Sequence, residues 1–354
     1  MKGQVITGRC EAARFTQLDW VRARCLDALG IDPYPGTLNL IVEADEDVKA
    51  WEALRSSPGF PIPPPAGFCA GRCYAVRVNR LRRGFGGQDD LLPAGVVVPD
   101  VPAYPAWQVE IIAAVPLRET LSITDGDLVT VEPSKPCAAR AVIFDVDATL
   151  VDSLTAYRIV AERAAAPFGV VITDAIVREA LNTTRHFWDI ALPADFAGRE
   201  SAARVLRDEA ARLWPEVLRE HGRVFDDIEP VLHTLRARGV KLGIMSASRR
   251  GSVDPLRQHG LLDLFDAIVT GEDVGQRKPD PEGLLMCAAG LDVPPGDAAY
   301  VGDTPLDIRA ARAAGMFSIG VLSGAGDSAI LSAAGADRLI PSVARLSDSF
   351  SIVI

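Results

Sequence analysis

The sequence of 354 residues predicts an α/β protein in two parts, a small β-rich barrel followed by a parallel α/β core with a helical insert. Short apolar runs between Pro and Gly residues fill the first part, and such runs are typical of strands. In the second part, short apolar runs alternate with longer segments of helical pattern, which is typical of a parallel sheet with helices on both faces. The pattern of apolar runs changes around SKPCAAR (134–140), so we expect one domain at 1–134 and another at 135–354.

The first domain is expected to contain several strands and one helix. The helix fits residues 16–29, where apolar residues recur at helical spacing. The segment SPGFPIPPPAGF (57–68) cannot form a central strand or a helix, because proline removes a backbone donor and fixes φ. We expect an exposed loop there, or a lid over a cleft. The runs expected to form strands are 36–43, 73–81, 94–99, 106–115 and 127–133.

The second domain is expected to contain a core, at 138–153 and 229–345, and a helical insert at about 154–228. The run 141–147 predicts a buried strand that ends in carboxylates. Ligands of an open parallel sheet bind outside the carboxyl ends of its strands, so polar residues at those ends are expected to converge. The further strands are expected at 240–246, 267–274, 298–304 and 317–322.

The composition argues against several kinds of partner. The formal charge of −10 gives no long-range attraction for nucleic acid or an anionic membrane, and a phosphate site must supply its own positive charge. No run reaches the roughly 18 consecutive apolar residues of a membrane helix, and residues 1–15 lack the apolar stretch of a secretory signal, so we expect a cytoplasmic protein. The six cysteines are expected to be free thiols rather than disulfides or zinc ligands.

Polar residues at the strand ends of the second domain form a coherent chemical set. Asp145 and Asp147 follow the first strand, and one carboxylate can attack phosphorus while the other moves the leaving-group proton. Ser246 ends the next strand, and its hydroxyl can donate to a phosphoryl oxygen. Lys278 can neutralise phosphate charge, and Asp303 can hold Mg²⁺, which prefers oxygen ligands. Because the metal offsets the repulsion between anions that meet in one site, the set predicts Mg²⁺-dependent phosphate chemistry.

Four segments that contain these residues, in this order, resemble the motifs of haloacid dehalogenase-like hydrolases. The likeness covers roughly residues 140–335 and implies a Rossmann-like parallel core with an inserted helical cap. Such a cap closes over the substrate, excludes water and selects the leaving group. The segments are DVDATLVDS (145–153), IMSAS (244–248), RKPDPEG (277–283) and YVGDTPLDIRAARAAG (300–315).

The resemblance implies a role for each residue of the set. The residue that matches Asp145 becomes an aspartyl phosphate, and the one that matches Asp147 is the acid and base, which favours phosphatase chemistry over dehalogenation. Ser246 and Lys278 match the phosphate-binding positions. The residues implied at the metal site are Asp145, the backbone carbonyl of Asp147, Asp303 and the supporting Asp307.

The sequence departs from the family pattern at two positions. Ala148 stands where glycine is usual, which is expected to tighten the turn, and Ala247 stands where asparagine is frequent, which is expected to change substrate contacts. Within the cap, Arg185 is a candidate substrate-binding residue. The neighbouring candidates are Asn182, Thr183, His186 and Trp188, and for His186 and Trp188 packing of the cap helices is the alternative.

In the first domain, the strongest signal is PYPGTLNLIVE (33–43). Thr37 and Asn39 alternate with leucines, so both fall on one face of a strand. Two oxygen-bearing side chains on one face can hold Mg²⁺ or a phosphate, and a hydrogen-bonded turn at the start of the strand is the alternative.

The first domain also resembles the archaeal, CTP-dependent type of riboflavin kinase. By that resemblance, Thr37 and Asn39 contact Mg²⁺ and the nucleotide phosphates, Glu110 is a general base at the acceptor, and the loop that starts at Gly8 holds CTP. The family loop is rich in glycine, whereas this chain has side chains at Cys10 and Ala12. We therefore expect nucleotide binding to be weakened, redirected to another ligand or lost. The matching segments are LGIDPYPGTLNL (29–40), AWQVEIIAAVPLRETL (106–121) and TDGDLVTV (124–131).

Together the two resemblances predict a Mg²⁺-dependent phosphomonoester hydrolase with an aspartyl-phosphate intermediate, joined to CTP-dependent phosphorylation of riboflavin or a related alcohol. Because a kinase and a phosphatase that both act on FMN would only consume CTP, we consider FMN under separate control or a ribityl-pyrimidine phosphate as the phosphatase substrate. The alternative is a phosphatase of another small phosphorylated metabolite, with an inactive barrel that binds a nucleotide or flavin as a regulatory module. The sequence leaves the substrate and the oligomeric state open.

Overall fold

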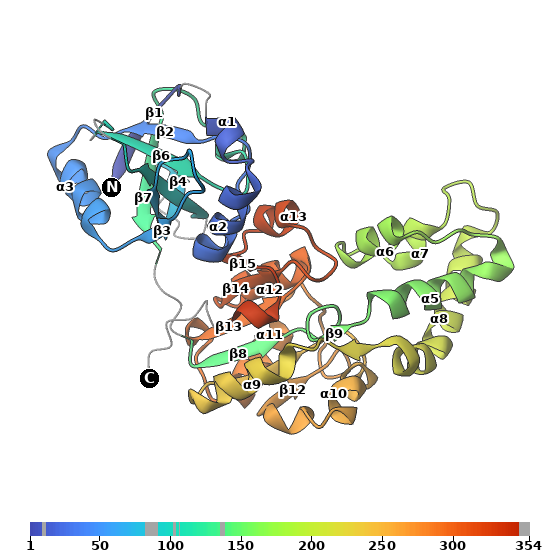
Figure 1. Cartoon of the computed structure of the whole chain (residues 1–354). Coiled ribbons are helices and arrows are strands. Elements are labelled where there is room, and N and C mark those ends of the chain that lie inside the picture. The colour runs from blue at the N-terminus through green and yellow to red at the C-terminus, as the bar shows by residue number, and fades with distance from the viewer. Residues whose placement is uncertain (9–11, 82–90, 102–103, 106, 135–138, 347–354) are drawn as a thin grey trace. The chain divides into compact units, whose positions relative to one another are not determined.

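The computed structural model describes most of the chain as two units, each with its own apolar core (Figure 1). One unit is Met1–Pro136 with Gly335–Leu339, and the other is Cys137–Ala334 with Ile340–Ile354. No helix in the described part of the chain has the length and apolar character needed to span a membrane. The described residues are 1–8, 12–81, 91–101, 104–105, 107–134 and 139–346.

The first unit is a closed antiparallel barrel, which confirms the predicted fold. Its strands follow the order β4-β5-β6-β2-β1-β7, and β7 pairs back with β4, so no strand of this ring is left as an open edge. The strands of the ring are β1 (Lys2–Ile6), β2 (Leu38–Ile41), β4 (Gly71–Arg80), β5 (Leu92–Pro99), β6 (Gln108–Ile112) and β7 (Leu128–Pro133).

Several elements of this unit were not predicted from the sequence, namely β1, β3, α1, α3 and α4, and the reasons are clearest for β3 and α3. The segment 57–68 contains a short strand, β3 (Phe60–Ile62), and its position at the edge of the sheet agrees with the exclusion of proline from central strands. The helix α3 (Asp45–Ser56) was not expected, although three acidic residues in its first turn favour a helix N-terminus. The other helices of this unit are α1 (Ala12–Phe15), α2 (Asp19–Leu29) and α4 (Leu117–Thr120).

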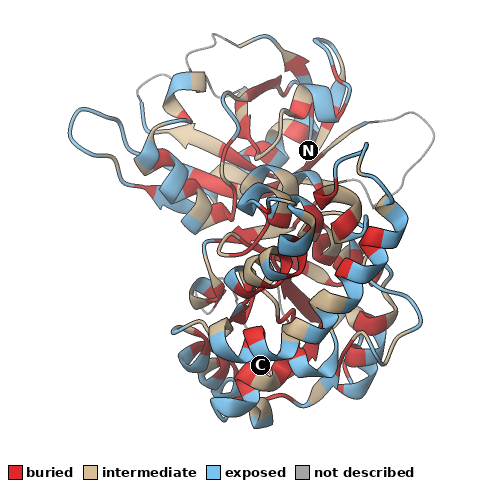
Figure 2. Cartoon of the chain, turned by 90° about the vertical axis from the view of Figure 1, so that its right-hand side faces the viewer, coloured by how far each residue is buried: buried red, intermediate tan, exposed pale blue. Residues whose placement is uncertain are grey.

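The second unit contains the predicted parallel sheet, in the order β12-β11-β8-β13-β14-β15. Neighbouring strands from β12 to β14 pair in parallel, and the central strands β8 and β13 are fully buried (Figure 2). The strands are β8 (Ala141–Phe144), β11 (Lys241–Met245), β12 (Ala267–Val269), β13 (Ala298–Gly302), β14 (Phe317–Val321) and β15 (Arg338–Ile340).

Helices cover both faces of this sheet, as alternating side chains require. Val142 and Phe144 point to the face covered by α9 and α10, whereas Ile143 points to the face covered by α11 and α12. The helices of this core are α9 (Ile228–Ala237), α10 (Asp254–Gln258), α11 (Glu282–Gly290), α12 (Pro305–Ala313) and α13 (Ser328–Ala333).

The four α-helices between β9 and β10 form the cap, which lies to one side of the sheet (Figure 1). The cap has its own apolar core around Trp188 and Leu206. A two-stranded antiparallel pair, β9 (Val151–Asp152) and β10 (Arg223–Val224), joins its two ends to the core. The cap helices are α5 (Leu154–Ala165), α6 (Asp174–Leu181), α7 (Phe187–Ala191) and α8 (Arg199–His221).

Candidate active site

Three adjacent parallel strands deliver the central residues of the site to one edge of the sheet. Asp145 follows β8, Ser246 follows β11, and Asp303 follows β13. Phe144 of β8 pairs in register with Ile244 on one side and Val301 on the other, so the three chains leave the sheet at the same level. The convergence expected at the carboxyl ends of the strands is therefore present.

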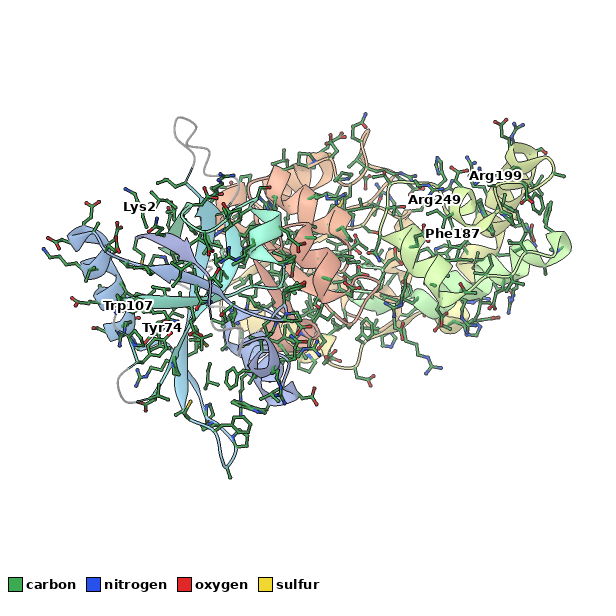
Figure 3. All side chains as sticks on the ribbon, turned by 90° about the horizontal axis from the view of Figure 1, so that it is seen from above. Lys2, Tyr74, Trp107, Phe187, Arg199 and Arg249 are labelled. Atoms are coloured by element: carbon green, nitrogen blue, oxygen red, sulfur yellow. The ribbon has the colours of Figure 1, made fainter. Side chains whose placement is uncertain are left out.

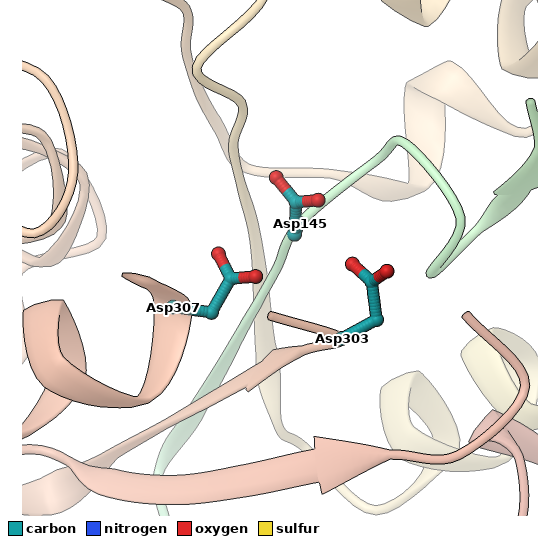
Figure 4. A group of neighbouring side chains, drawn as sticks. All are labelled: Asp145, Asp303 and Asp307. Atoms are coloured by element: carbon teal, nitrogen blue, oxygen red, sulfur yellow. The ribbon is translucent and has the colours of Figure 1, made fainter. Parts of the chain in front are cut away.

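Three buried aspartates form a tight group at this edge. One carboxylate oxygen from each of Asp145, Asp303 and Asp307 lies within 4.8 Å of the others, and the side chains point toward one another (Figure 4). Asp303 is held by the Thr149 hydroxyl at 3.2 Å and by the backbone N–H of Ala325 at 2.7 Å. The group offers several oxygen ligands at short range, as a small divalent cation requires.

Lys278 lies inside this group and contacts two of the three carboxylates. Its Nζ donates to Asp145 Oδ1 at 2.7 Å, to Asp307 Oδ1 at 2.5 Å and to the Tyr300 hydroxyl at 3.0 Å. The Tyr300 hydroxyl in turn lies 3.0 Å from Asp307 Oδ1 and donates to the carbonyl of Met245 at 3.0 Å. Tyr300 was not predicted as a site residue, because a tyrosine inside a buried strand has the pattern of core packing.

Asp307 differs from Asp303 because one of its two hydrogen-bonded oxygens faces the ammonium of Lys278. Oδ1 faces Lys278 and Tyr300, and Oδ2 accepts from the backbone N–H of Thr304 at 2.9 Å and from its hydroxyl at 2.6 Å. This capping box begins α12 and fixes the Asp307 side chain. Asp307 is therefore better placed to orient Lys278 than to give up an oxygen to a metal.

The charges of the group leave an excess of negative charge for a metal to offset. Burial raises the pKa of Asp145, although Lys278 opposes the shift, and burial with the charge of Asp307 raises the pKa of Asp303 to about 7. Burial alone would also raise the pKa of Asp307, but Lys278 and Thr304 bring it below its ordinary value. Three carboxylates against one ammonium thus fit Mg²⁺ in charge and in ligand type.

Asp147 lies at the side of the group with one oxygen engaged and one not. Its Oδ2 accepts from the Ser248 hydroxyl at 2.6 Å, while its Oδ1 is buried and has no hydrogen-bond partner among the described residues. Burial raises the pKa of Asp147, and the bond from Ser248 opposes the shift. Ser248 was not among the predicted site residues, although it is the last residue of the segment IMSAS and lies three residues after β11.

Ser246 is fully buried with its hydroxyl oriented by two donors. Its Oγ accepts from the Ser248 backbone N–H at 3.1 Å and from the Ser252 hydroxyl at 3.3 Å. Both bonds use acceptor positions, so the proton of Ser246 stays available to donate. Ala247 follows it and lines the neighbouring cavity.

The turn after Asp145 adopts the conformation that glycine usually provides. Ala148 has φ 59°, in the left-handed region, and its backbone N–H donates to the carbonyl of Val151 at 2.7 Å and to the Ser153 hydroxyl at 3.2 Å. The alanine therefore keeps the turn, and these bonds offset its unfavourable backbone conformation.

A cavity of about 810 Å³ opens between the cap and the core, and only part of the predicted cap set reaches it. Trp188 lines the cavity, whereas Arg185, Asn182, Thr183 and His186 do not. Arg185 instead donates to the carbonyl of Asp189 at 2.9 Å and is exposed.

In the barrel, the predicted residues form one hydrogen-bonded row. Asn39 Nδ2 donates to Thr37 Oγ1 at 3.2 Å, and Gln108 Nε2 donates both to Asn39 Oδ1 at 3.2 Å and to Glu110 Oε1 at 3.1 Å. Gln108 was missed, although it lies two residues from Glu110 and so on the same strand face. Gly8 packs so closely that a Cβ there would lie 2.2 Å from Asn39 Nδ2.

The remainder of the predicted loop of the barrel lies largely outside the described residues. Residues 9–11, with the Cys10 substitution, and the side chain of Ala12 lie outside the described part of the structure. Beside Thr37, a small pocket of about 200 Å³ is lined by Tyr34, Gly36 and Glu119, among others.

Comparison with known proteins matches the two units to two families. A model described as haloacid dehalogenase-like hydrolase matches residues 142–321. A second model, for CTP-dependent riboflavin kinase and described as a domain of unknown function, DUF120, matches residues 5–132.

Curated relatives and solved structures resemble rather more than half of this chain. Phosphoglycolate phosphatases of Salmonella paratyphi A and Escherichia coli K12 are 31% and 30% identical, each over 52% of this chain and 82% of the relative. A haloacid dehalogenase-like hydrolase from Bacteroides fragilis is 31% identical, with a TM-score of 0.52, over 59% of this chain and 99% of its own. A predicted phosphoglycolate phosphatase from Haemophilus somnus, at 21% identity and a TM-score of 0.53, covers 60% of this chain and 97% of its own and shares the fold.

Proposed function

Because this chain belongs to the haloacid dehalogenase-like hydrolases, we propose that its second unit is a Mg²⁺-dependent phosphomonoesterase whose nucleophile is Asp145. The proposal rests above all on the position of Asp145, which is buried at the strand edge, bonded to Lys278 and grouped with Asp303. We further propose that the catalytic domain is 135–354, with its cap at about 154–228.

The proposed reaction has two steps, and Asp145 and Asp147 take part in both. A carboxylate oxygen of Asp145 attacks phosphorus, and Asp147 gives its proton to the leaving alcohol oxygen as the P–O bond breaks. Asp147 then takes a proton from water, whose oxygen attacks the aspartyl phosphate and releases inorganic phosphate with Asp145 restored. The unengaged Oδ1 of Asp147 supports this role, because no hydrogen bond within the described residues competes with one to the leaving oxygen or the water.

Two further side chains are proposed to hold the phosphoryl oxygens. Lys278 supplies positive charge beside Asp145, and Ser246 offers the hydroxyl proton that its own hydrogen bonds leave available. Mg²⁺, held by Asp145, Asp303 and the Asp147 carbonyl, would offset the repulsion between carboxylate and phosphate and polarise the P–O bonds. Asp307 is proposed to support the metal site indirectly, by orienting Lys278.

Phosphate release tests this function. Purified chain would be given phosphoglycolate, FMN and other small phosphate esters, with Mg²⁺ or with EDTA. We expect Mg²⁺-dependent release by the wild type and none by Asp145→Asn, while the exposed control Asp263→Asn keeps full activity. Normal hydrolysis by Asp145→Asn would show that the nucleophile is another group.

For the first unit, we propose CTP-dependent phosphorylation of riboflavin or a related alcohol, with a regulatory binding module as the alternative. The match to the kinase family and the row from Thr37 to Glu110 support the first reading. In that reading Thr37 and Asn39 contact Mg²⁺ and the CTP phosphates, Gly8 lets the chain approach them, and Glu110 takes the acceptor proton.

The Asp145→Asn protein also serves to test the barrel, since its phosphatase cannot consume the product. It would be mixed with riboflavin, Mg²⁺ and either CTP or ATP, and FMN would be measured by chromatography. FMN formed only with CTP supports the kinase. No FMN with either nucleotide, together with measurable binding of CTP or riboflavin, supports the regulatory module.

A further inference from the structure

Residues of both the cap and the core line the large cavity between them. With about 810 Å³ it falls within the range that holds drug-sized ligands, whereas the two-carbon alcohol of phosphoglycolate would leave most of it empty. Cap helices α5, α7 and α8 form one wall, and the segment after β11 forms the other. The residues that decide its character are Tyr157, Phe187, Trp188, Trp214, Ala247 and Ser248.

Ser248 connects this cavity to the chemistry. It lines the cavity and donates to Asp147 at 2.6 Å. In the proposed function, on which this inference rests, Asp147 protonates the leaving oxygen. The cavity is therefore on the leaving-group side of the site and receives the alcohol part of the ester.

Aromatic rings dominate the cap wall. The rings of Tyr157 and Trp214 lie 4.4 Å apart at 47°, and those of Phe187 and Trp188 lie 4.9 Å apart at 75°. Small side chains, among them Ala210 and Ala211, line the same wall. Tilted rings around an open space provide both faces and edges, which are the contacts that a further aromatic ring prefers.

The charges around the cavity are positive within an acidic chain. Four arginines line it against two acids, and Phe187 and Arg249 can be followed in Figure 3. Within the part of the chain that the structure describes, Arg250 pairs with Asp273, whereas Arg249 and Arg277 make no ion pair. Such a lining attracts a phosphate dianion toward a site that the net charge of −10 would otherwise disfavour.

We propose that the substrate is a phosphomonoester whose alcohol carries an aromatic or heteroaromatic ring, held between the rings of the cap and the segment after β11. Only a bulky alcohol group would fill the cavity. The aromatic rings of its wall favour a flat aromatic group over an alkyl chain. The arginines then bring the phosphoryl end toward Asp145.

Three synthetic esters test this proposal without a change in leaving-group chemistry. Ethyl phosphate, octyl phosphate and 2-(1-naphthyl)ethyl phosphate are all esters of primary alcohols, so differences in kcat/KM report on the cavity. We expect the naphthylethyl ester to exceed ethyl phosphate about 100-fold, from apolar burial and ring contacts, and to exceed octyl phosphate. Equal values for naphthylethyl and ethyl phosphate, or a preference for the octyl ester, would overturn the proposal.

Substitutions of residues that line the cavity test whether the cavity causes this substrate preference. Trp214→Ala should lower the ratio of naphthylethyl to ethyl kcat/KM about tenfold, through the lost ring contact. Ala211→Trp fills the space and should lower the same ratio without removing a ring. Val205→Ala is the matched control on α8, since Val205 is 54% exposed and does not line the cavity.

A binding measurement separates this inference from the proposed function. The Kd of each ester would be measured with Asp145→Asn, which holds the esters without turnover. If the wild type hydrolyses none of the three, the phosphatase function fails, but tighter binding of the naphthylethyl ester would still support the aromatic site. Hydrolysis of all three with equal Kd values would leave the phosphatase standing and reject the aromatic site.

Discussion

Arg178 of the cap and Asp303 of the core are connected through a single residue, Ala325. The backbone N–H of Ala325 donates to Asp303 Oδ2 at 2.7 Å, and its carbonyl accepts from Arg178 Nη1 at 3.2 Å and from Asn182 Nδ2 at 3.1 Å. A Cβ at Gly324 would lie 2.3 Å from the Asp303 side chain, so the close approach of this loop depends on glycine. The cap and a proposed metal ligand thus hold the same loop from opposite sides.

This connection predicts that loss of the Arg178 side chain weakens the metal site. Arg178→Ala removes bonds to the carbonyls of Gly324 and Ala325, each worth about 0.5–1.5 kcal/mol. We expect the Mg²⁺ concentration for half-maximal phosphatase activity to rise several-fold. Titration of activity with Mg²⁺ measures it, and Arg204→Ala, at an exposed arginine of the cap, is the control. An unchanged Mg²⁺ requirement would mean that the loop holds Asp303 without the cap.

Removal of Lys278 is expected to affect both rate and stability. Lys278→Ala takes away the cation proposed to face the phosphoryl group, so kcat should fall about 100-fold or more. It also leaves the buried carboxylates of Asp145 and Asp307 without their partner, which should lower the free energy of unfolding by about 3–5 kcal/mol.

Steady-state kinetics and urea denaturation at saturating and at zero Mg²⁺ check the two effects of Lys278→Ala separately. The exposed Lys49→Ala serves as control, with neither quantity changed. A variant that kept its rate but lost stability would limit Lys278 to a structural role.

The Tyr300 hydroxyl is expected to act through Lys278. Tyr300→Phe removes one of the three acceptors of the ammonium and leaves the Met245 carbonyl without its donor, at a cost of about 1–3 kcal/mol in stability. We expect kcat to fall about tenfold with little change in KM, because the ring stays in place while the ammonium loses one contact. Tyr34→Phe, at a tyrosine 45% exposed, is the matched control. A change in KM alone would argue against a role in positioning Lys278.

The position of Asp145 shows why part of the site could be predicted from the sequence. The carboxyl ends of neighbouring parallel strands meet at one edge, so an apolar run followed by a carboxylate already indicates where the side chain lies. Ser248, Tyr300 and Ala325 lack such a signal. Their roles depend on which atoms the folded chain brings within hydrogen-bond distance, and no local pattern contains that information.

The fold, like the site, could be predicted from the sequence only in part. Most strands of the two large sheets were visible as short apolar runs, because each buries a face or both faces in a core, but β1 and β15 were not predicted. The helix α3 was missed because its polar, acidic sequence buries little beyond Trp51. The edge strand β3 was missed because it contains a proline, which a strand tolerates only at an edge, where one side of the backbone needs no hydrogen-bond partner. In the cap, the sequence pattern did not distinguish Trp188, which lines the cavity, from Asn182, which holds the core loop.

Glu110 is expected to lower the stability of the barrel at neutral pH. Burial raises the pKa of Glu110 above its ordinary value of 4.5, and the side chains of Tyr104 and Gln108 only partly oppose the shift. The folded chain therefore holds the proton more firmly than the unfolded chain. Stability contributed by this group is highest below the ordinary pKa and is lost as the pH rises toward the raised one.

Glu110→Gln should accordingly raise the melting temperature of the barrel at pH 7, since a neutral amide can still accept from Gln108 and carries no buried charge. The gain should disappear at about pH 4, where Glu110 itself is largely protonated. Calorimetry of the full-length chain at both pH values measures it, with the exposed Glu132→Gln as control. Because a general base cannot be replaced by an amide, the same variant should form no FMN from riboflavin and CTP. A variant that was more stable yet fully active would remove Glu110 from the proposed acceptor site, and one that was no more stable at pH 7 would contradict the burial of its charge.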